Sequence, residues 1–267
     1  MEVVVRGESR ILAPVIAASG ARYQLPGDPD TQFWGKGPLA TVIWSGEALP
    51  QCAPAGTVIP PFRASGNEPF WAVDYDGWQL TLREPGKPPR AVDAQVLETR
   101  PDGQTIGGGD GQKALRLRVD DGICVDSMSG MPRPQRVTLQ EEGESRQGCG
   151  GDPSRLLQGA VWKVVEMSGK QVATDPSTWI SFLTDGKIAG STGCNRFFGA
   201  YGLTGEGLVI DKVASTRMAC PPAQLESEQQ FTQHLLAVRG FDFDDSGALI
   251  LNGVAGDLRA VADASAQ

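Results

Sequence analysis

Residues 192–199 read Thr-Gly-Cys-Asn-Arg-Phe-Phe-Gly, and residues 216–220 read Thr-Arg-Met-Ala-Cys. The first run is a glycine-punctuated turn between strand-forming residues, because glycine supplies the backbone freedom that tight turns need. The second run ends just before Pro222, and proline is favoured at the first position of a helix. Together the two runs predict a sheet whose strands are followed by a helix over residues 222–239.

The predicted helix carries Leu225, Phe231, Leu235 and Val238 roughly on one face, and Gly240 would end it. The 267-residue chain also holds 34 glycines and 19 prolines, so many turns between short strands are expected. The fold class is therefore predicted to be mainly β. We expect three small antiparallel β-rich domains, of which the last is an α+β domain with the one main helix.

A chain of this length is long for one domain and has enough residues to bury several hydrophobic cores. Residues 53–62 are rich in proline and are typical of a join between domains. We place the three domains at residues 1–55, 56–153 and 154–267. The first domain is expected to hold four strands, two of them within residues 2–25.

The chain is mildly acidic, with a formal net charge of −8. Residues 1–52 carry 4 basic and 5 acidic groups, residues 53–153 carry 11 and 15, and residues 154–267 carry 9 and 12. Because no segment is basic, nucleic acid and anionic membrane surfaces are poor partners. A cationic protein is the natural electrostatic partner, although a mildly acidic surface is also ordinary for a soluble domain.

Five cysteines occur, and none lies in a C-x-x-C pair. Disulfides from Cys124 to Cys149 and from Cys194 to Cys220 would each close a loop of about 25 residues, and each would stabilise the fold by about 3–4 kcal/mol. Such bonds imply an oxidising compartment. Buried thiols in a cytosolic protein are the alternative, and Cys52 is left over from these two pairs.

The sequence gives little support to catalysis or to metal binding. His234 is the single histidine and has no nucleophile motif beside it, so a zinc site would need scattered ligands. The carboxylate pairs Asp120-Asp121 and Asp244-Asp245 are adjacent, so the two side chains of each pair would diverge on a strand. No phosphate-binding Gly-Lys-Ser/Thr loop occurs. We expect no enzyme activity, no metal and no cofactor.

Two early runs place groups suited to carboxylates in loops. Residues 17–23 read Ala-Ala-Ser-Gly-Ala-Arg-Tyr, and residues 33–37 read Phe-Trp-Gly-Lys-Gly. The hydroxyl of Ser19 and the ammonium of Lys36 each stand beside glycine and near an aromatic residue. Residues 26–30 between the two runs have the composition of a loop. The alternative is a turn serine and a solvated lysine without a joint role.

These two runs, followed by Cys52, resemble the membrane-bound inhibitor family of c-type lysozyme, the MliC type. The resemblance implies a small antiparallel barrel, here present only in part, that binds c-type lysozyme. In that family the serine of the Ser-Gly motif and the lysine of the second loop enter the cleft of the enzyme. These roles carry over to Ser19 and Lys36, with Gly20 and Tyr23 shaping the loop.

The chemistry of the expected target explains why these residue types would block it. C-type lysozyme works with a protonated glutamate and an ionised aspartate that face each other across its cleft. The ammonium of Lys36 would pair with the carboxylate, and the hydroxyl of Ser19 would hydrogen-bond to the acid. Arg22 either adds a bidentate contact to the enzyme or is a surface charge.

The chain begins Met-Glu-Val-Val-Val-Arg-Gly, without a charged, apolar and cleavable leader, and no run approaches 18 apolar residues. In the inhibitor family the cysteine equivalent to Cys52 pairs with one near the start of the domain. We therefore expect a signal peptide and the first inhibitor strands to precede this sequence in the natural protein. A lipid-attachment cysteine would then be one form of membrane anchor, and the expected location is the periplasm or outer membrane.

The middle domain is similar to an uncharacterised bacterial envelope-lipoprotein domain. The similarity rests on the run Glu-Pro-Phe-Trp at residues 68–71, the run Met-Ser-Gly at residues 128–130 and the run Gly-Cys-Gly-Gly at residues 148–151. It covers about 90 residues and names no activity. We expect a β domain with one disulfide.

The runs at residues 192–199 and 216–220 resemble the META domain, which occurs in envelope proteins of the heat-inducible HslJ type. The similarity extends over residues 156–260, because the helix and the final strand pair follow in the same order. Members are associated with stress and antibiotic tolerance, with no shared reaction. The alternative function is thus a non-catalytic envelope protein of stress or antibiotic tolerance that acts through this domain.

Asn195, Arg196 and Arg217 allow two interpretations. Either they form a small polar site, or the asparagine caps backbone groups near its turn while the arginine pairs with a carboxylate. The sequence leaves the oligomeric state and the choice of lysozyme open. Aromatic residues of the first two domains are predicted to lie in the core rather than in contacts with a partner: Phe33, Trp34, Trp44, Phe70, Trp71 and Trp78.

Overall fold

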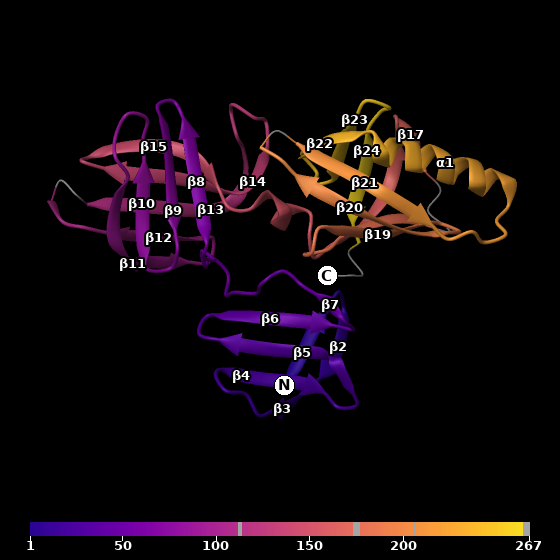
Figure 1. Ribbon diagram of the computed structural model, residues 1–267, viewed down its shortest axis with the longest axis horizontal. Helices are drawn as coiled ribbons and strands as arrows, with labels where there is room; N and C mark the ends of the chain where they lie inside the picture. Colours follow the sequence, from indigo (N-terminus) through magenta and orange to yellow (C-terminus); the bar gives the residue numbers. More distant parts are fainter. Residues whose placement is uncertain (112–113, 173–176, 206, 264–267) are drawn as a thin grey trace. The chain divides into compact units, whose positions relative to one another are not determined.

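The structure is a computed structural model that describes residues 1–111, 114–172, 177–205 and 207–263. It is built mainly of antiparallel strands, and the described residues contain one α-helix (Figure 1). The prediction of a mainly β fold is therefore confirmed. Short strands joined by glycine turns give each sheet enough curvature to bury one of its faces.

Contacts along the chain define two units. Met1–Gln51 group with Leu157–Gln267, and Cys52–Leu156 form the other unit. The division into three domains stays a prediction, and the last four residues of the third domain lie outside the described part of the chain. Each sheet is described by itself below.

Seven strands form the N-terminal sheets. The hairpin of β1 and β2 stands alone as a two-stranded sheet, whereas β3 to β7 make a five-stranded antiparallel sheet in chain order. The prediction of four strands is wrong, because strands of two or three residues are too short to leave a sequence pattern. The seven strands are β1 (Glu2–Val5), β2 (Glu8–Ile11), β3 (Ala13–Val15), β4 (Ala21–Leu25), β5 (Asp28–Lys36), β6 (Leu39–Trp44) and β7 (Glu47–Ala48).

The loop expected at residues 26–30 is also shorter than predicted. Only Pro26 and Gly27 form the turn, and β5 begins at Asp28. Gly27 has φ +82°, the conformation that a type II turn requires at its second central residue, and Pro26 suits the first. This tight turn lets β4 and β5 run side by side (Figure 1).

A cation on β2 ties the first hairpin to the five-stranded sheet. The guanidinium of Arg10 lies 4.4 Å from the ring centroid of Trp44, which is 7% exposed. It also donates hydrogen bonds of 2.9 Å each to Thr31 Oγ1 and Ser45 Oγ. Because Thr31 is fully buried, this polar network replaces part of a larger hydrophobic core.

The middle unit is a closed eight-stranded antiparallel barrel, in which β15 returns to pair with β8 (Figure 1). A short 3-10 helix, η2 (Pro153–Leu156), follows it. Closure removes exposed strand edges. The strands of the barrel are β8 (Phe62–Asn67), β9 (Phe70–Tyr75), β10 (Gln79–Arg83), β11 (Arg90–Arg100), β12 (Gly103–Gly108), β13 (Leu115–Val125), β14 (Pro132–Glu141) and β15 (Glu144–Gly150).

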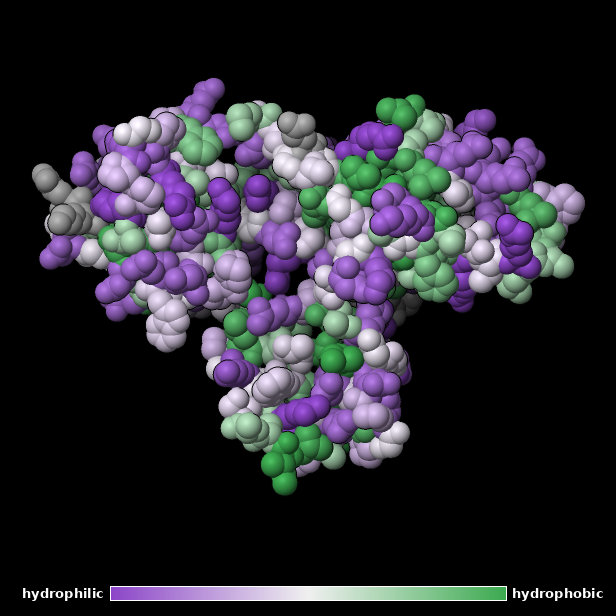
Figure 2. Space-filling view, viewed as in Figure 1, coloured by the Kyte–Doolittle hydropathy of each residue, from purple (hydrophilic) through white to green (hydrophobic). Residues whose placement is uncertain are grey.

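Alternate residues of every barrel strand point inward and fill the interior. Trp71, Leu80, Ile106, Leu117 and Leu139 are each at most 1% exposed and belong to one buried cluster. The visible face of the barrel is largely hydrophilic in Figure 2, as expected when the apolar side chains lie inside. The barrel is thus a packed core rather than a channel.

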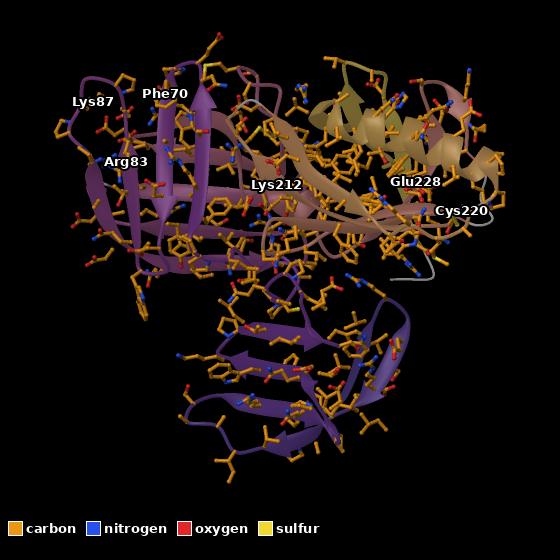
Figure 3. All side chains as sticks on the ribbon, turned by 45° about the vertical axis from the view of Figure 1, so that its right-hand side comes forward. Phe70, Arg83, Lys87, Lys212, Cys220 and Glu228 are labelled. Carbon is orange, nitrogen blue, oxygen red and sulfur yellow. A yellow bond between two sulfur atoms is a disulfide. The ribbon has the colours of Figure 1, made fainter. Side chains whose placement is uncertain are left out.

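Two aromatic residues of the barrel were predicted to be core and are not. Phe70 is 43% exposed and Trp78 is 82% exposed. Because successive side chains of a strand alternate between faces, the burial of Trp71 in β9 turns Phe70 outward (Figure 3). Trp78 belongs to the turn between β9 and β10, before the first inward position at Leu80.

The C-terminal sheet has nine strands and one helix, α1 (Pro222–Leu236). Its order is β21-β20-β19-β18-β16-β24-β23-β22, with β17 paired to β16. The strands are β16 (Val161–Met167), β17 (Lys170–Gln171), β18 (Thr178–Phe182), β19 (Lys187–Thr192), β20 (Arg196–Leu203), β21 (Leu208–Ser215), β22 (Val238–Phe243), β23 (Leu249–Gly253) and β24 (Leu258–Ala262).

The predicted helix exists but is shorter than expected. It begins at Pro222 as predicted and ends at Leu236 rather than near residue 239, because Val238 is fully buried as the first residue of β22. Leu235 is also fully buried, whereas Leu225 is 40% exposed and lies off the buried face. In the described part of the chain no helix has the length and apolar character needed to cross a membrane.

The packed barrel predicts a large cost for a cavity at its centre. Leu80→Ala should lower the free energy of unfolding by about 3 kcal/mol, because Leu80 has no exposed surface and its site cannot collapse fully. Leu97→Ala is the matched control, since Leu97 is 45% exposed on β11, and it should change stability by under about 0.5 kcal/mol. Urea denaturation followed by tryptophan fluorescence measures both, and equal effects would contradict the packed interior.

Candidate protein-binding site

Ser19 and Lys36 lie at the same end of the five-stranded sheet. Ser19 is in the bend between β3 and β4, and Lys36 is the last residue of β5. In the antiparallel β4–β5 ladder, Ala21 is the partner of Gly35. Gly20 precedes Ala21 and Lys36 follows Gly35, so these two residues meet at the same end of the sheet. Ser19 and Lys36 are both exposed. The structure therefore brings the two predicted residues to the same end of the sheet.

Gly20 is required by the packing of this bend. Its φ is +70°, and a Cβ placed on it would lie 2.2 Å from the carbonyl oxygen of Gly35. The indole N–H of Trp34 donates a 2.9 Å hydrogen bond to the carbonyl oxygen of Ser19. The bend is thus pressed against β5 and fixed there by a side chain of that strand.

The two reactive groups of the site are available for an external partner. The ammonium group of Lys36 makes no hydrogen bond or ion pair with any described residue, and the same holds for the hydroxyl group of Ser19. The backbone of Ser19 is nevertheless held by Trp34, so a partner meets a positioned hydroxyl. Less conformational entropy is then lost on binding than with a mobile loop.

Arg22 and Tyr23 are held on opposite faces of β4. The Nε and one terminal nitrogen of Arg22 donate to Gln32 Oε1 at 2.9 and 2.5 Å. Tyr23 packs edge-on against Phe33, with the ring centroids 6.3 Å apart. The face of Arg22 also carries Trp34, its cross-strand partner. Arg22 is therefore oriented from within the sheet, with guanidinium donors left over.

Trp34 was predicted to lie in the core, and it is 42% exposed. The sequence contained a signal for this, since residues two apart on a strand share a face. Trp34 and Lys36 are two residues apart on β5, so both lie on its solvent-exposed face. Phe33 lies on the opposite face, with its cross-strand partner Val42, which is buried. The site thus includes an aromatic surface beside the ammonium group.

Both predicted disulfides are present. Cys124 and Cys149 are joined with their Cα atoms 5.5 Å apart, and Cys194 and Cys220 with theirs 6.1 Å apart. Cys52 is exposed and lies outside both bonds. The first disulfide links β13 to β15 on the barrel, and the second links the turn before β20 to the segment before α1.

The side chain of Asn195, which is 2% exposed, joins separate segments of the C-terminal sheet through hydrogen bonds. Its Oδ1 accepts hydrogen bonds from Thr216 Oγ1 at 2.8 Å and from the Met218 N–H at 2.9 Å. Its Nδ2 donates to Glu228 Oε2 at 2.7 Å and lies 3.5 Å from Cys220 Sγ. Figure 3 shows Glu228 and Cys220 at the same end of this sheet. The asparagine caps a backbone group as predicted, but of a distant segment rather than its own turn.

The two arginines of these motifs do not join a common site with Asn195. The guanidinium of Arg196 lies 5.4 Å from the ring centroid of Trp179. Ser191 on β19 is the cross-strand partner of Trp179 on one side and of Arg196 on the other. The Arg196 side chain therefore reaches across β19 to the ring. Arg217 is exposed and hydrogen-bonds to no described residue. The expected pairing of an arginine with a carboxylate is wrong for Arg196 because an aromatic face replaces the carboxylate.

His234 makes two hydrogen bonds on α1. Its Nε2 lies 2.7 Å from Ser168 Oγ, and its Nδ1 lies 2.8 Å from the carbonyl oxygen of Gln230. This arrangement ties the helix to the hairpin of β16 and β17. Over the residues that can be described, no group of three His, Cys, Asp or Glu side chains could hold a metal ion.

The adjacent carboxylates serve turns and ion pairs. Asp120 accepts hydrogen bonds from Arg118 and Arg100 at 2.8 and 2.7 Å, and the hydrogen bond from Arg118 is the main cause that lowers its pKa. Asp244 accepts from Ser246 Oγ at 2.5 Å, which likewise lowers its pKa. Both groups are therefore held ionised by hydrogen bonds within local structure.

The structure defines a disulfide-bonded, β-rich protein that exposes a serine and a lysine at one end of its N-terminal five-stranded sheet. Comparison with protein families then gives two matches. Residues 2–51 match the membrane-bound lysozyme-inhibitor of c-type lysozyme, or MliC, and residues 155–266 match the META domain. Both resemblances expected from the sequence are thereby confirmed, to MliC at the N-terminus and to the META domain at the C-terminus.

Comparison with individual proteins adds little. No curated protein matches the chain. An NMR structure of a protein from Burkholderia xenovorans is similar with 22% sequence identity and a TM-score of 0.34, over 41% of this chain and 86% of that one. A likeness at this level says nothing about function. The family matches therefore stand as the main relation to known proteins.

The close packing of Gly20 can be tested against an equally strained glycine. Gly20→Ala and Gly27→Ala both place a side chain at positive φ, but nothing lies within 4 Å of a Cβ at Gly27. Gly27→Ala should cost about 1–2 kcal/mol of unfolding free energy, and Gly20→Ala should cost more and shift the indole N–H resonance of Trp34. If that resonance stays in place in Gly20→Ala, the bend is not packed as described.

The joint at Asn195 should be costly to break. Asn195→Ala removes the hydrogen bonds that the Asn195 side chain makes with the Met218 N–H and with the Glu228 carboxylate. It should therefore lower the unfolding free energy by on the order of 3 kcal/mol. Asn252→Ala, at an exposed position of β23, is the control and should change little. Urea denaturation of both variants measures the difference, and a loss below that of the control would rule out the joint.

Proposed function

We propose that the N-terminal segment binds c-type lysozyme and blocks its cleft through Ser19 and Lys36. The observation that carries the proposal is their joint exposure at one end of the sheet, with neither the ammonium nor the hydroxyl engaged by a described residue. The match of residues 2–51 to the MliC family supports the choice of partner. Inhibitor and enzyme would meet as two folded surfaces.

The two groups suit the two carboxyl groups of the enzyme. An ionised aspartate in the cleft offers an acceptor to the Lys36 ammonium, and a protonated glutamic acid offers a hydrogen-bond partner to the Ser19 hydroxyl. Once water is excluded, the ion pair strengthens because the surrounding dielectric falls. Both catalytic groups would then be occupied, and the substrate could not enter.

The surroundings of the pair favour a protein partner. Trp34 presents an exposed aromatic surface on the face of Lys36, and tryptophan is enriched among residues that dominate binding energy. Arg22, held by Gln32 on the same face, adds guanidinium donors. The net charge of −8 would favour encounter with a cationic lysozyme through long-range attraction.

The protein is inferred to act at the bacterial envelope, in the periplasm or at the outer membrane. The name of the MliC family describes membrane-bound inhibitors, and the two disulfides suit an oxidising compartment. A lipid anchor attached before the first strand would give membrane binding without a spanning helix. We also infer that the protein inhibits by binding alone and is not itself an enzyme.

A second function rests on the C-terminal domain. The META match covers more of the chain than the MliC match does. On this alternative the protein is a non-catalytic envelope protein of stress or antibiotic tolerance, and the N-terminal segment only contributes to stability. The two functions differ in whether Ser19 and Lys36 matter for activity.

Inhibition of hen egg-white lysozyme is the decisive assay. The parent chain should slow lysis of bacterial cell walls, and Lys36→Ala should weaken inhibition at least about 30-fold, since loss of a buried charge pair costs about 2 kcal/mol or more. Ser19→Ala should weaken it less, because a neutral hydroxyl forms the weaker bond. The double variant should lose most inhibition.

Lys170→Ala is the matched control for this assay. Lys170 is exposed on β17, outside the MliC segment, so its removal changes the net charge by the same amount and should leave inhibition unchanged. Equal losses in Lys36→Ala and Lys170→Ala would indicate a general charge effect. A parent chain that does not inhibit would overturn the proposal in favour of the META domain.

A further inference from the structure

Three separated runs of the middle domain line one cavity of about 290 Å³. They are residues 65–67 at the end of β8, residues 124–127 at the end of β13 and residues 147–149 of β15. These runs adjoin or contain the motifs by which the domain resembles an envelope-lipoprotein domain. The proposed lysozyme binding uses none of them. Their convergence on one cavity makes that cavity a candidate site.

A cation without an internal partner lines this cavity. Arg136 lies on β14 between inward-facing neighbours such as Val137, so its side chain is on the outer face of the barrel, where Cys149 is its cross-strand partner. Its guanidinium forms no hydrogen bond or ion pair with the described residues. Gly122 leaves room for it, since a Cβ there would lie 2.9 Å from a guanidinium nitrogen.

An anion also lines the cavity. Asp126 is 8% exposed, and its Oδ1 accepts hydrogen bonds from the backbone N–H groups of Met128 and Ser129 at 3.1 and 2.8 Å. Among the described residues, its Oδ2 accepts only one long hydrogen bond, of 3.4 Å, from Asn67 Nδ2. Burial opposes ionisation, but the hydrogen bonds from Ser129 lower the pKa of Asp126 below its ordinary value. Asp126 is therefore a charged acceptor with one oxygen weakly engaged.

The cavity thus offers opposite charges to a small ligand. A guanidinium binds a carboxylate through two parallel hydrogen bonds, and a carboxylate oxygen accepts from an ammonium group. The volume lies at the small end of the range of ligand pockets, which excludes large cofactors. The side chain of Gln147, also in the wall, adds a neutral hydrogen-bonding group.

We propose that this cavity binds a free α-amino acid, with its carboxylate on Arg136 and its ammonium on Oδ2 of Asp126. The disulfide between Cys124 and Cys149 forms part of the wall and holds the two strand ends that carry it. The site is independent of Ser19 and Lys36, so the lysozyme assay and this proposal succeed or fail separately.

Titration of the full chain with three probes tests the charge requirement. L-alanine has both groups, propionate lacks the ammonium, and ethylamine lacks the carboxylate. L-alanine should shift the side-chain amide resonances of Asn67 and Gln147 in a saturable way. Each probe with one charge should bind at least tenfold more weakly, because it leaves either Arg136 or Asp126 unpaired.

Arg136→Gln should weaken binding of L-alanine at least tenfold without loss of stability, since Arg136 is exposed and its guanidinium bonds to no described residue. Arg116→Gln is the matched control, because Arg116 is an exposed arginine of β13 outside this cavity. Asp126→Asn keeps the shape of the side chain and should weaken binding of L-alanine while leaving that of propionate unchanged. If Asp126→Asn does not fold, the Arg136→Gln result alone decides.

Three outcomes would overturn the proposal. One is the absence of any saturable shift with L-alanine. Another is unchanged binding of L-alanine in Arg136→Gln, or an equal loss in Arg116→Gln. The third is propionate binding as tightly as L-alanine, which would show that the ammonium makes no contact.

Discussion

The side-chain amide of Asn195 joins segments that lie far apart in the chain. Through three hydrogen bonds it connects the turn before β20, the segment after β21 and the helix α1. The disulfide from Cys194 to Cys220 lies beside it and crosses the same gap. A buried amide with all its partners is stabilising, whereas the same amide without them is costly. The position of α1 on its sheet therefore depends on this joint.

The N-terminal segment is short, and its sheet is stabilised in a different way. Its five-stranded sheet is open, so a network around Arg10 and a close contact between Gly20 and β5 supply part of its order. The Ser19 hydroxyl and the Lys36 ammonium have no hydrogen-bond or ion-pair partner among the residues of this segment. An open sheet with an exposed aromatic residue, Trp34, and unengaged polar groups suits a surface that is completed by a partner.

The interior of the middle barrel is filled and leaves no room for a ligand. Its inward positions are occupied by large apolar side chains, so a ligand can be held only on the outside or at the ends. The long strands β13 and β14 pair over their whole lengths, and Cys124 on β13 and Arg136 on β14 belong to the wall of an outer cavity. The disulfide between Cys124 and Cys149 fixes that wall to β15. The packed interior and the proposed ligand site are thus on different sides of the barrel wall.

By itself the sequence determined the mainly β class, both disulfide pairs, the start of α1 at Pro222 and the two family motifs. These follow from composition, from cysteine spacing and from residues that act locally. The number of strands in the first segment, the exposure of Phe70 and Trp78, and the end of α1 were decided only by the tertiary structure. So were the closure of the barrel and the distant partners of Asn195. The physical reason is that pairing register and burial depend on contacts between residues far apart in the chain, and no local pattern records them.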